Sequence, residues 1–458
     1  MKLRRMGRNG DIPRGPKGSF IFGHYADYSR DPLGFLTRCA TEYGDVIAFR
    51  LPGARFYLLT EPELIGRVFA ETNSKYINHA GARTPITRRL FGSGLLTSEG
   101  REWRRQRRLT FPSFRHSSVE KFRDAMIAET RRTLDGWKDG KRIDVFGEMI
   151  SLTLRTLLRT LICYEPQVGL DVISRSFIDL TDGFLLKNKI QSFGMLMSLP
   201  VRRRHRRAIE RLDQFVTEVI RRRRISGDQG DDLLSVLMAA EYEDGKPVTD
   251  TQLQGEIKTF LFTGIFGVAL SLAWSLFLTA GDTEVSRKLE QETDNVLENE
   301  APGIDNIKKC NFARQIVKES LRLYPPIWAS GREAVADTEI GDYFVPRGTQ
   351  MILSQWVMHR SPRFWDEPER FDPTRWATES EVPRYAYFPL GGGPRFCMGD
   401  AYGEMQSIIV MSMISQRFRL RRAAGGPVGL IPSLGLFPAG ELNVCVEDRA
   451  VKRTAVAA

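Results

Sequence analysis

A long uncharged stretch in the middle of the chain predicts one central helix. Residues 259–280 contain no charged side chain and are rich in apolar ones. Thr249 or Asp250 suits the N-cap of a helix that leads into this stretch, and Gly281 marks its end. Hydropathy alone would also fit a membrane span. We interpret the stretch as a helix inside a protein core, because no second span follows and small residues that allow close packing interrupt it: Gly264, Gly267 and Ala269.

Shorter periodic segments surround this central one. Apolar residues recur at helical spacings in residues 32–43, 61–69, 119–163 with a break near 136–140, 172–225 with a break near 193–200, and 398–418. Strand-like patterns occupy residues 46–50 and 55–59 around the turn Pro52-Gly53, and a hairpin is expected near residues 432–437. The pattern therefore predicts a mainly α fold with a small β region, an α+β arrangement.

Nothing in the sequence divides the chain into separate domains. No linker, repeat or low-complexity tract interrupts residues 1–458, so we expect one large domain. Residues 1–11 are interpreted as a flexible basic tail, because they lack the apolar segment of a signal peptide or anchor. The five cysteines are odd in number and widely spaced, which argues against a disulfide framework. We expect a soluble, cytoplasmic monomer without a transmembrane anchor.

The charge balance favours some partners over others. There are 67 Lys plus Arg against 56 Asp plus Glu, a formal net charge of +11, which suits an acidic partner. The basic residues are dispersed along the chain, so nucleic-acid binding is not expected.

One loop near the C-terminal end combines glycines, an arginine and a cysteine. Residues 388–399 read Phe-Pro-Leu-Gly-Gly-Gly-Pro-Arg-Phe-Cys-Met-Gly. The run from Gly391 to Gly393 permits a tight bulge that brings a flat ligand against the main chain. Cys397 precedes a helical pattern, and a helix N-terminus favours the metal-binding thiolate. Arg395 suits an anionic group on the same ligand. A buried structural cysteine in an ordinary loop is the simpler alternative.

This loop closely resembles the cysteine-ligand loop of the cytochrome P-450 family. In that family the thiolate is the fifth ligand of haem iron, so the resemblance implies haem b bound through Cys397. It covers residues from about 12 to 447. Leu390 departs from the family, which usually has Phe there. The loop residues that the resemblance assigns to cofactor binding are Arg395, Gly391, Gly393 and Gly399.

A second motif lies in the first quarter of the chain. Trp103 and Arg107 are four residues apart and share one helix face, where an indole N–H and a guanidinium suit one carboxylate. An exposed basic helix would show the same spacing. The resemblance implies that this pair contacts a haem propionate, and that Arg332 reaches the second one.

The pair Glu319 and Arg322 has a structural interpretation. An acid and a base at i and i+3 are common on helix surfaces. The resemblance implies instead that Glu319, Arg322 and Arg370 form a buried triad, which supports the cysteine loop and takes no part in catalysis.

The central helix departs from the family at its middle. Relatives usually read Ala/Gly-Gly-x-Asp/Glu-Thr, and the aligned residues here are Thr263-Gly264-Ile265-Phe266-Gly267. Phe266 and Gly267 thus replace an acid and an alcohol that help deliver protons in relatives, an assistance worth a factor of about 10² to 10⁴. Three explanations stay open. Thr263, a substrate hydroxyl or ordered water carries the protons; peroxide replaces dioxygen; or the reaction is a rearrangement, dehydration or coupling.

The resemblance implies a function in small-molecule oxidation. We expect a hydrophobic substrate such as a terpenoid or other secondary metabolite, O2 as oxidant, and electrons from a ferredoxin or flavodoxin-type donor, because the chain has no reductase domain. A haem-thiolate peroxygenase, isomerase, dehydratase or coupling enzyme is the second class of function, and a non-catalytic haem or ligand-binding protein the third. The expected catalytic positions are Thr263, Phe266 and Gly267, and the expected pocket residues are Leu95, Phe260, Ile327 and Leu434.

Overall fold

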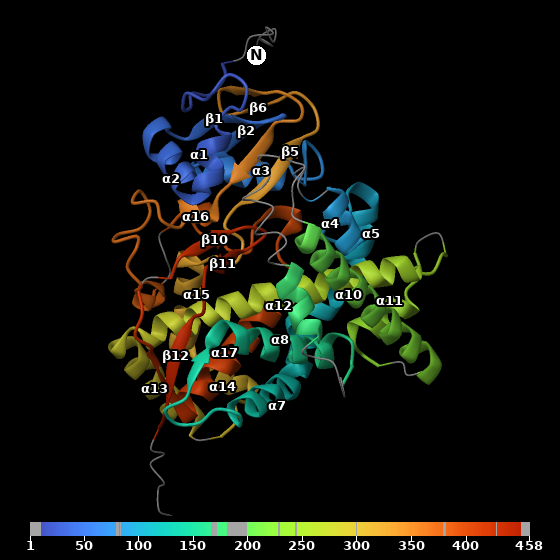
Figure 1. Cartoon of the computed structure of the whole chain (residues 1–458), viewed down its shortest axis with the longest axis vertical. Helices are drawn as coiled ribbons and strands as arrows, with labels where there is room; N and C mark the ends of the chain where they lie inside the picture. Colours follow the sequence, from blue (N-terminus) through green and yellow to red (C-terminus); the bar gives the residue numbers. More distant parts are fainter. Residues whose placement is uncertain are drawn as a thin grey trace, which may run out of the picture.

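The computed structural model shows a helical molecule with small sheets at its periphery (Figure 1). It describes residues 11–78, 82, 84–165, 172–180, 199–227, 230–242, 245–298, 300–378, 382–426 and 428–449. The tail expected at residues 1–11 lies outside these ranges except for Asp11. The break expected near residues 193–200 lies outside them except for its last two residues.

Helices dominate the described residues. They are α1 (Tyr25–Arg30), α2 (Pro32–Tyr43), α3 (Pro62–Ala70), α4 (Pro85–Phe91), α5 (Gly100–Thr110), α6 (His116–Val119), α7 (Arg123–Leu134), α8 (Val145–Leu161), α10 (Leu199–Ser226), α11 (Leu233–Ala239), α12 (Asp250–Ala280), α13 (Thr283–Leu297), α14 (Ile304–Lys309), α15 (Asn311–Leu323), α16 (Gln355–Met358) and α17 (Asp400–Arg417). Residues 172–180 are also helical. Short 3-10 turns are η2 (Phe111–Phe114), η3 (Glu120–Phe122), η5 (Pro373–Trp376), η6 (Arg384–Ala386) and η7 (Gly393–Arg395).

The strands form four small sheets. They are β1 (Val46–Leu51), β2 (Ala54–Leu59), β3 (Tyr76–Asn78), β4 (Arg142–Asp144), β5 (Ser330–Ala334), β6 (Thr338–Ile340), β7 (Tyr343–Val345), β8 (Gln350–Leu353), β9 (Phe418–Arg422), β10 (Leu430–Pro432), β11 (Leu436–Pro438) and β12 (Asn443–Asp448). The largest sheet has the order β1-β2-β8-β5-β3, in which only β2 and β8 pair in parallel. The others are β4-β12-β9, β10-β11 and β6-β7. The mainly α fold with a small β region is confirmed.

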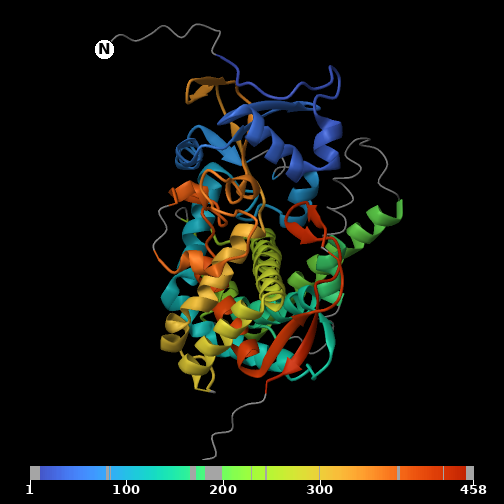
Figure 2. The ribbon, with the colours of Figure 1, turned by 90° about the vertical axis from the view of Figure 1, so that its left-hand side faces the viewer.

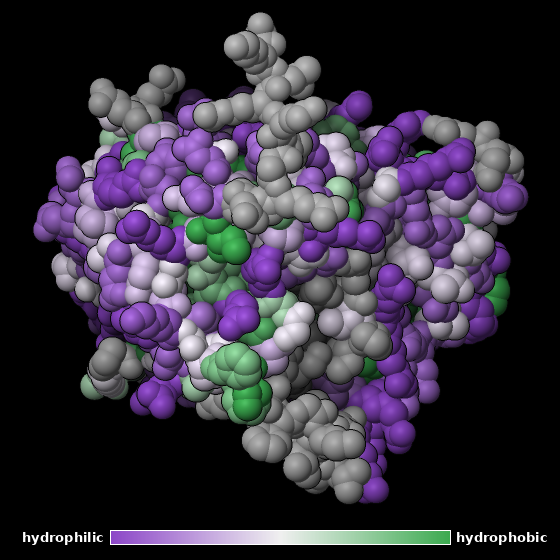
Figure 3. All heavy atoms as spheres, turned by 90° about the horizontal axis from the view of Figure 1, so that it is seen from above, coloured by the Kyte–Doolittle hydropathy of each residue, from purple (hydrophilic) through white to green (hydrophobic). Residues whose placement is uncertain are grey.

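The five-stranded sheet and the long helices occupy different ends of the molecule. Figure 1 places the sheet at the top, beside α1, α2 and α3, and most long helices below it. The surface seen from this end is largely polar, with a few apolar groups between purple ones (Figure 3). The cysteine loop lies between these regions in the chain's packing, since η7 contacts α3 and α17 packs on α12 and α7.

The central helix has the bounds that its cap residues predict. The Thr249 side chain accepts a hydrogen bond from the Gln252 N–H at the start of α12, and Gly281 follows its last residue. Figure 2 shows α12 in yellow-green inside the molecule, with helices around it. In the described part of the chain it is the one helix long and apolar enough to span a membrane, but 78% of that window is buried within the protein. It is therefore a core helix.

The other predicted elements agree with the structure to within a few residues at their ends where the residues are described, with one addition. Residues 181–198 of the helical pair predicted at 172–225 lie outside the described residues. The helix at residues 32–43 and the hairpin of β1 and β2 are present. Residues 119–163 hold α7 and α8, but β4 lies between them and pairs with β12 at the other end of the chain. A strand whose partner is so distant has no local signal in the sequence.

Candidate functional site

The cysteine loop is a closed bulge that leads into α17. Within it the Gly391 N–H donates to the Phe388 carbonyl at 2.9 Å, and the Cys397 N–H donates to the Leu390 carbonyl at 3.1 Å. Gly391 and Gly393 have φ values of 75° and 65°, which favour glycine. The glycine run thus does produce the tight backbone path that the sequence predicts.

Two of the loop glycines are required by a protein neighbour. A Cβ on Gly393 would lie 2.1 Å from the Phe69 carbonyl oxygen, and one on Gly392 would lie 2.8 Å from the Phe69 ring. Gly391 has nothing within 4 Å of its Cβ position. The close backbone approach in this loop is therefore made to α3, while Gly391 faces open space.

Cys397 stands just before α17 with its side chain exposed. Surrounding protein atoms nevertheless withdraw the sulfur from water enough to raise the pKa of the thiol, and the Asp400 carboxylate adds to this. A hydrogen bond from the Gly399 backbone and the Arg107 charge lower the same pKa. The helix N-terminus therefore does not by itself produce a thiolate. A bound metal would do so, because a coordinating thiol is deprotonated outright.

Three guanidinium groups gather near this loop. Arg107 Nη2 donates to the Phe396 carbonyl at 3.1 Å, and Arg395 donates to Glu99 Oε2 at 2.6 Å. The buried Trp103 ring lies under Arg395, 4.7 Å from its central carbon, and 5.6 Å from that of Arg107. Arg332 is buried and donates to the Thr72 hydroxyl at 3.1 Å. The structure thus brings together the four residues that the sequence assigned to carboxylate binding.

This cluster carries more positive than negative charge. Burial and the charge of Arg395 lower the pKa of Arg332 to about 10, and burial lowers that of Arg395. Among the described residues neither Arg107 nor Arg332 forms an ion pair, and the buried Nε of Arg395 has no hydrogen-bond partner. A ligand with two carboxylates would supply the missing negative charge and acceptors. The residues present therefore fit a haem group with its two propionates.

One face of α12 is open in its buried middle. From Gly255 to Leu276 every residue is buried except Phe260, Thr263, Gly264 and Gly267. These recur at intervals of three and four, so they form a stripe on one side of the helix. A Cβ on Gly267 would meet nothing within 4 Å, whereas one on Gly264 would lie 3.0 Å from Leu157 of α8. Thr263 and Gly267 thus face open space.

Phe266 is not part of this stripe. Its ring lies 4.6 Å from Phe262 and 5.3 Å from Phe437 of β11, and it is 6% exposed. Neighbours on a helix point about 100° apart, so Phe266 and Gly267 face different directions. The expected catalytic place of Phe266 beside Thr263 and Gly267 stays a prediction. The ring packs α12 against the C-terminal hairpin.

The expected pocket residues come from four segments. Ile327 and Leu434 are 44% and 38% exposed. Their segments are held together because Trp328 Nε1 donates to the Ser433 carbonyl at 2.9 Å and the Leu436 N–H donates to the Pro326 carbonyl at 3.0 Å. Leu95 is partly buried, and its N–H reaches Glu256 of α12 at 3.1 Å. Phe260 stacks on Phe114 at 5.1 Å.

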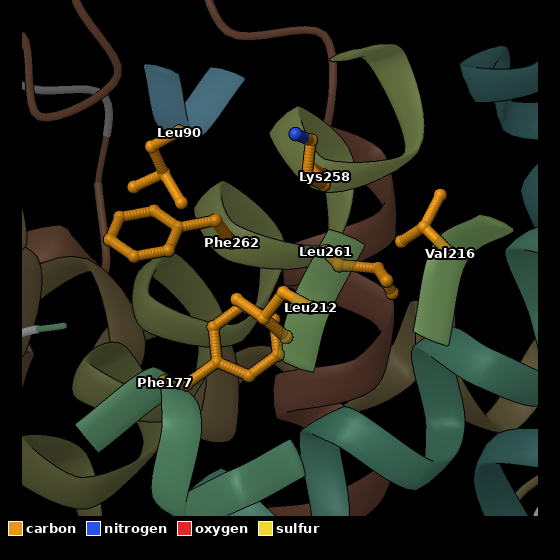
Figure 4. A pocket seen from close by; sticks show the side chains of 7 residues that line it. All are labelled: Leu90, Phe177, Leu212, Val216, Lys258, Leu261 and Phe262. Atoms are coloured by element: carbon orange, nitrogen blue, oxygen red, sulfur yellow. The ribbon is translucent and has the colours of Figure 1, made fainter. Parts of the chain in front are cut away.

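A small apolar cavity lies on the other side of α12. Figure 4 shows its lining, Leu90, Phe177, Leu212, Val216, Lys258, Leu261 and Phe262, from α12, α4, α10 and residues 172–180. None of the expected site residues contributes to it. We treat it as a packing gap between helices.

The acid and base of α15 form a buried cluster, as expected, but with a different third member. Glu319 and Arg322 are fully buried and joined by bonds of 2.8 and 2.9 Å. Arg375 donates to Glu319 at 3.1 Å, as does Trp376 at 2.9 Å. The prediction of Arg370 in this triad is wrong, because its side chain turns outward to Glu367 at 2.7 Å. It contributes its carbonyl, which accepts from Arg322 at 3.0 Å.

His359 joins this cluster to the cysteine loop, a role that the sequence did not reveal. Its Nε2 accepts from the Phe388 N–H at 2.9 Å, and its Nδ1 lies 3.2 Å from the Arg322 carbonyl. Burial and the charge of Arg360 lower its pKa to about 3, so the ring is neutral. The dipeptide His359-Arg360 was the only signal in the sequence, and it did not indicate which residues His359 contacts.

Comparison with known proteins finds similar chains. The family model described as Cytochrome P450 matches residues 13–445. Cyclooctat-9-en-7-ol 5-monooxygenase of Streptomyces melanosporofaciens is 34% identical over 411 residues, which cover 88% of each chain. Cyclooctatin synthase of the same organism is 31% identical over 440 residues, 95% of each. Pentalenene oxygenase of Streptomyces avermitilis is 30% identical over 405 residues, 87% of this chain and 89% of that protein.

Proposed function

Since the chain belongs to the cytochrome P450 family, whose cofactor is a haem-thiolate, we propose that it is a monooxygenase that oxidises a terpenoid. The names of its relatives include a cyclooctat-9-en-7-ol 5-monooxygenase and a pentalenene oxygenase. The observation that carries the proposal is the position of Cys397, directly before α17 and beside a cluster of three arginines.

We assign the cofactor to these residues. Cys397 holds the iron of haem b, and Trp103, Arg107, Arg332 and Arg395 hold its propionates. A Cβ built on Gly403 of α17 would lie 3.6 Å from the side chain of Val268, the residue after Gly267. This contact relates the cysteine segment to the open stripe of α12. When bound, the haem supplies the activation of dioxygen.

The chain's own residues bind and orient the substrate. Apolar surface that suits a hydrocarbon skeleton comes from α12 and three loops, through Phe260, Leu95, Ile327 and Leu434. Gly267 leaves space on α12 where a side chain would otherwise stand. A bulky polycyclic substrate uses that space, and Thr263 offers it one hydroxyl.

The missing acid and alcohol support a second candidate function. Phe266 is an aromatic packing residue and Gly267 has no hydroxyl, so the usual donors to bound dioxygen are absent at these positions. An enzyme that uses peroxide, or that performs an isomerisation, dehydration or coupling, needs less assistance of this kind. The identity of the product, and whether its formation depends on O2, on peroxide or on neither, distinguish the monooxygenase from these other enzymes.

The partner of the proposed monooxygenase is a ferredoxin or flavodoxin in the cytoplasm. Two arginines at the end of α17 and in β9 are already paired within the protein, Arg417 with Asp135 at 2.7 Å and Arg419 with Glu290. Arg104 of α5 is exposed and forms no ion pair within the described residues, so it is the better candidate for an acidic partner.

The first experiment is the spectrum of the reduced protein under carbon monoxide. Thiolate ligation gives a strongly red-shifted Soret band in the wild type, which is lost in Cys397→Ser and kept in Cys163→Ser, an exposed cysteine elsewhere. Turnover of cyclic terpenes is then measured with O2 and a surrogate ferredoxin system, with peroxide, and with neither. Product only with O2 and reductant supports a monooxygenase. Product without either would establish the second class, and a haem-free protein would refute the whole assignment.

A further inference from the structure

A buried carboxyl group lies on α12 near the open stripe. Glu256 is 1% exposed. Its Oε2 accepts a hydrogen bond from the Leu95 N–H at 3.1 Å, while its Oε1 is buried without a hydrogen-bond partner. The neighbouring cation Lys258 points elsewhere and pairs with Asp213 at 2.6 Å. A buried carboxyl without a cation and with one unpartnered oxygen is costly, which suggests a use beyond packing.

Glu256 shares the direction of the open stripe. Positions 256, 260, 263 and 267 follow one another at intervals of four, three and four, so they lie along one side of the helix. Between Glu256 and Thr263 stands Thr259, whose buried hydroxyl also has no hydrogen-bond partner. That hydroxyl lies 2.5 Å from the Cβ position of Gly94, the residue before Leu95. The Glu256 carboxyl and the Thr259 hydroxyl therefore both lie against the turn that contains Gly94 and Leu95.

The surroundings keep this carboxyl protonated at neutral pH. The pKa of Glu256 is raised to about 8, mainly by burial and to a smaller extent by the charge of Glu102 on α5, while the hydrogen bond from the Leu95 N–H lowers it. Tyr242 is another ionisable neighbour of Glu256, and the central carbon of the Arg105 guanidinium lies 3.7 Å from the centre of the Tyr242 ring. A carboxyl that keeps its proton at neutral pH is suited to act as a general acid.

We propose that Glu256 is the proton reservoir of the site, which supplies protons through Thr259 and Thr263 to the open face of α12. The inference rests on the proposed function and answers which groups replace the acid and alcohol absent at Phe266 and Gly267. Glu256 and Thr259 are positioning residues in this scheme, and Thr263 is the group exposed to the site.

The transfer conserves protons at each atom. Glu256 Oε1 and the Thr259 hydroxyl have no hydrogen-bond partner and so do not touch each other, and a bridging water takes the proton of Glu256 and gives one of its own to Thr259. The Thr259 proton moves on towards Thr263. The Thr263 hydroxyl, which donates to the Thr259 carbonyl at 2.7 Å, turns away from it and gives its proton to a water on the open face of α12. Each hydroxyl ends with one proton and Glu256 ends as a carboxylate, stabilised by the Leu95 N–H. The hydroxyls are one turn apart, about 6 Å along the helix axis, so one water bridges them. Solvent returns one proton to Glu256 in each cycle.

Infrared difference spectroscopy on the purified holoenzyme tests the reservoir without turnover. A protonated-carboxyl band is expected at neutral pH, lost as the pH rises through about 8, and absent from Glu256→Gln. Glu102→Gln is the matched control, because it removes an exposed carboxyl nearby and should keep the band. A wild-type spectrum without this band would overturn the proposal, whatever the enzyme's substrate.

The second readout is coupling, the product formed per electron pair consumed. Glu256→Gln keeps an acceptor for Leu95 but has no proton to give. We expect coupling in Glu256→Gln to fall by about tenfold or more relative to the wild type, with an increased solvent isotope effect. Coupling in the wild type should decline above about pH 8, whereas coupling in the variant should not. Glu256→Asp should restore part of the lost coupling. Thr259→Val, which keeps the side-chain shape, should reproduce the loss and serves if Glu256→Gln does not fold. Unchanged coupling in a folded Glu256→Gln or Thr259→Val variant would refute the relay.

The two proposals fail in different ways. An enzyme that shows the carboxyl band but no dioxygen-dependent product would retain the buried acid and lose the monooxygenase assignment. An enzyme that oxidises its substrate with equal coupling in wild type and Glu256→Gln would keep the function and lose the relay.

Discussion

The buried Arg322 side chain makes five hydrogen bonds through its N–H donors. Two bonds reach the Glu319 carboxylate, and three reach the carbonyls of His359, Pro368 and Arg370. The most distant of these partners is 48 residues away in sequence. Only a planar guanidinium presents five donors in a fixed fork, so lysine cannot reproduce this arrangement. One side chain thus joins α15 to the segment that precedes the cysteine loop.

Replacement of this residue tests the cluster. Arg322→Lys should lower the free energy of unfolding by about 3 kcal/mol or more, because buried acceptors and the Glu319 carboxylate lose partners. Urea unfolding followed by circular dichroism measures it. Arg370→Lys is the control, with an expected change under about 1 kcal/mol, since its side chain is 60% exposed and pairs only with Glu367. Equal losses in both variants would contradict the geometry of the cluster.

His359 should make stability depend on acid. Its pKa is about 3 in the folded protein, against an ordinary value of 6.5. Between these values the unfolded chain binds a proton that the folded one does not, so stability is full above about pH 6.5 and falls as the pH decreases towards 3. His359→Gln should show a shallower decline in this window. Denaturation at stepped pH measures it, with the exposed His116→Gln as control, and an unchanged slope in His359→Gln would contradict the assignment.

At the scale of the element, α12 contains two glycines with opposite surroundings. Gly264 permits the close packing of α8, since Leu157 lies 3.0 Å from its Cβ position, while Gly267 borders open space. The same substitution at the two positions therefore separates helix propensity from packing. The comparison also shows whether the open space beside Gly267 lowers the free energy of unfolding of the protein.

Alanine at these positions gives a matched pair. Gly267→Ala should stabilise the protein by up to about 1 kcal/mol, because alanine favours the helix and its methyl meets nothing. Gly264→Ala should gain nothing or lose stability, because Leu157 must move. Thermal unfolding of both variants measures the difference. A destabilised Gly267→Ala would mean that the stripe is closed in solution.

The cysteine loop offers a second pair at this scale. Gly391→Ala adds only the strain of a positive φ, about 1 to 2 kcal/mol. Gly393→Ala adds the same strain and a clash with the Phe69 backbone, so it should cost clearly more and release haem at lower temperature. Loss of the Soret band on heating measures both. If the two variants lose haem alike, the contact with α3 does not support the loop.

At the scale of the whole molecule, the largest of three buried apolar clusters runs from Leu90 to Val446 and includes α12, α8 and α17, while the other two lie around the five-stranded sheet. Tyr324 and Leu430 pack against both the largest cluster and the one that includes α2, which joins these two regions. We therefore predict that the domain unfolds in one transition, in line with a single domain over the whole chain. Near-ultraviolet and far-ultraviolet circular dichroism should give the same midpoint in urea. Two separated midpoints would indicate independent units and contradict the single-domain interpretation.

The sequence was informative where the signal is local. The cap at Thr249, the uncharged run of α12 and the glycines before Cys397 each identify an element without knowledge of its partners. These features, together with the resemblance to the P450 family, also led to the helical fold and the family, both of which are confirmed.

Features that depend on distant partners were not predictable. Arg370 and Arg375 are five residues apart, and only the turn η5 decides which guanidinium reaches Glu319. Glu256 looks like an ordinary charged residue near a helix start, and it is buried because the Leu95 segment covers it. β4 needs β12, whose Cys445 stands opposite Arg142.

The parallel pairing of β2 with β8 has a consequence for synthesis of the protein. Leu59 stands opposite Leu353, so the ribosome must add 294 residues (353 minus 59) after Leu59 before its partner exists. At about 5 to 20 residues per second this takes about 15 to 60 seconds. During that time the nascent β1–β2 hairpin has an unpaired edge exposed to other chains. Chaperones and slow, cool expression should therefore improve the yield of soluble protein more than any change near the haem.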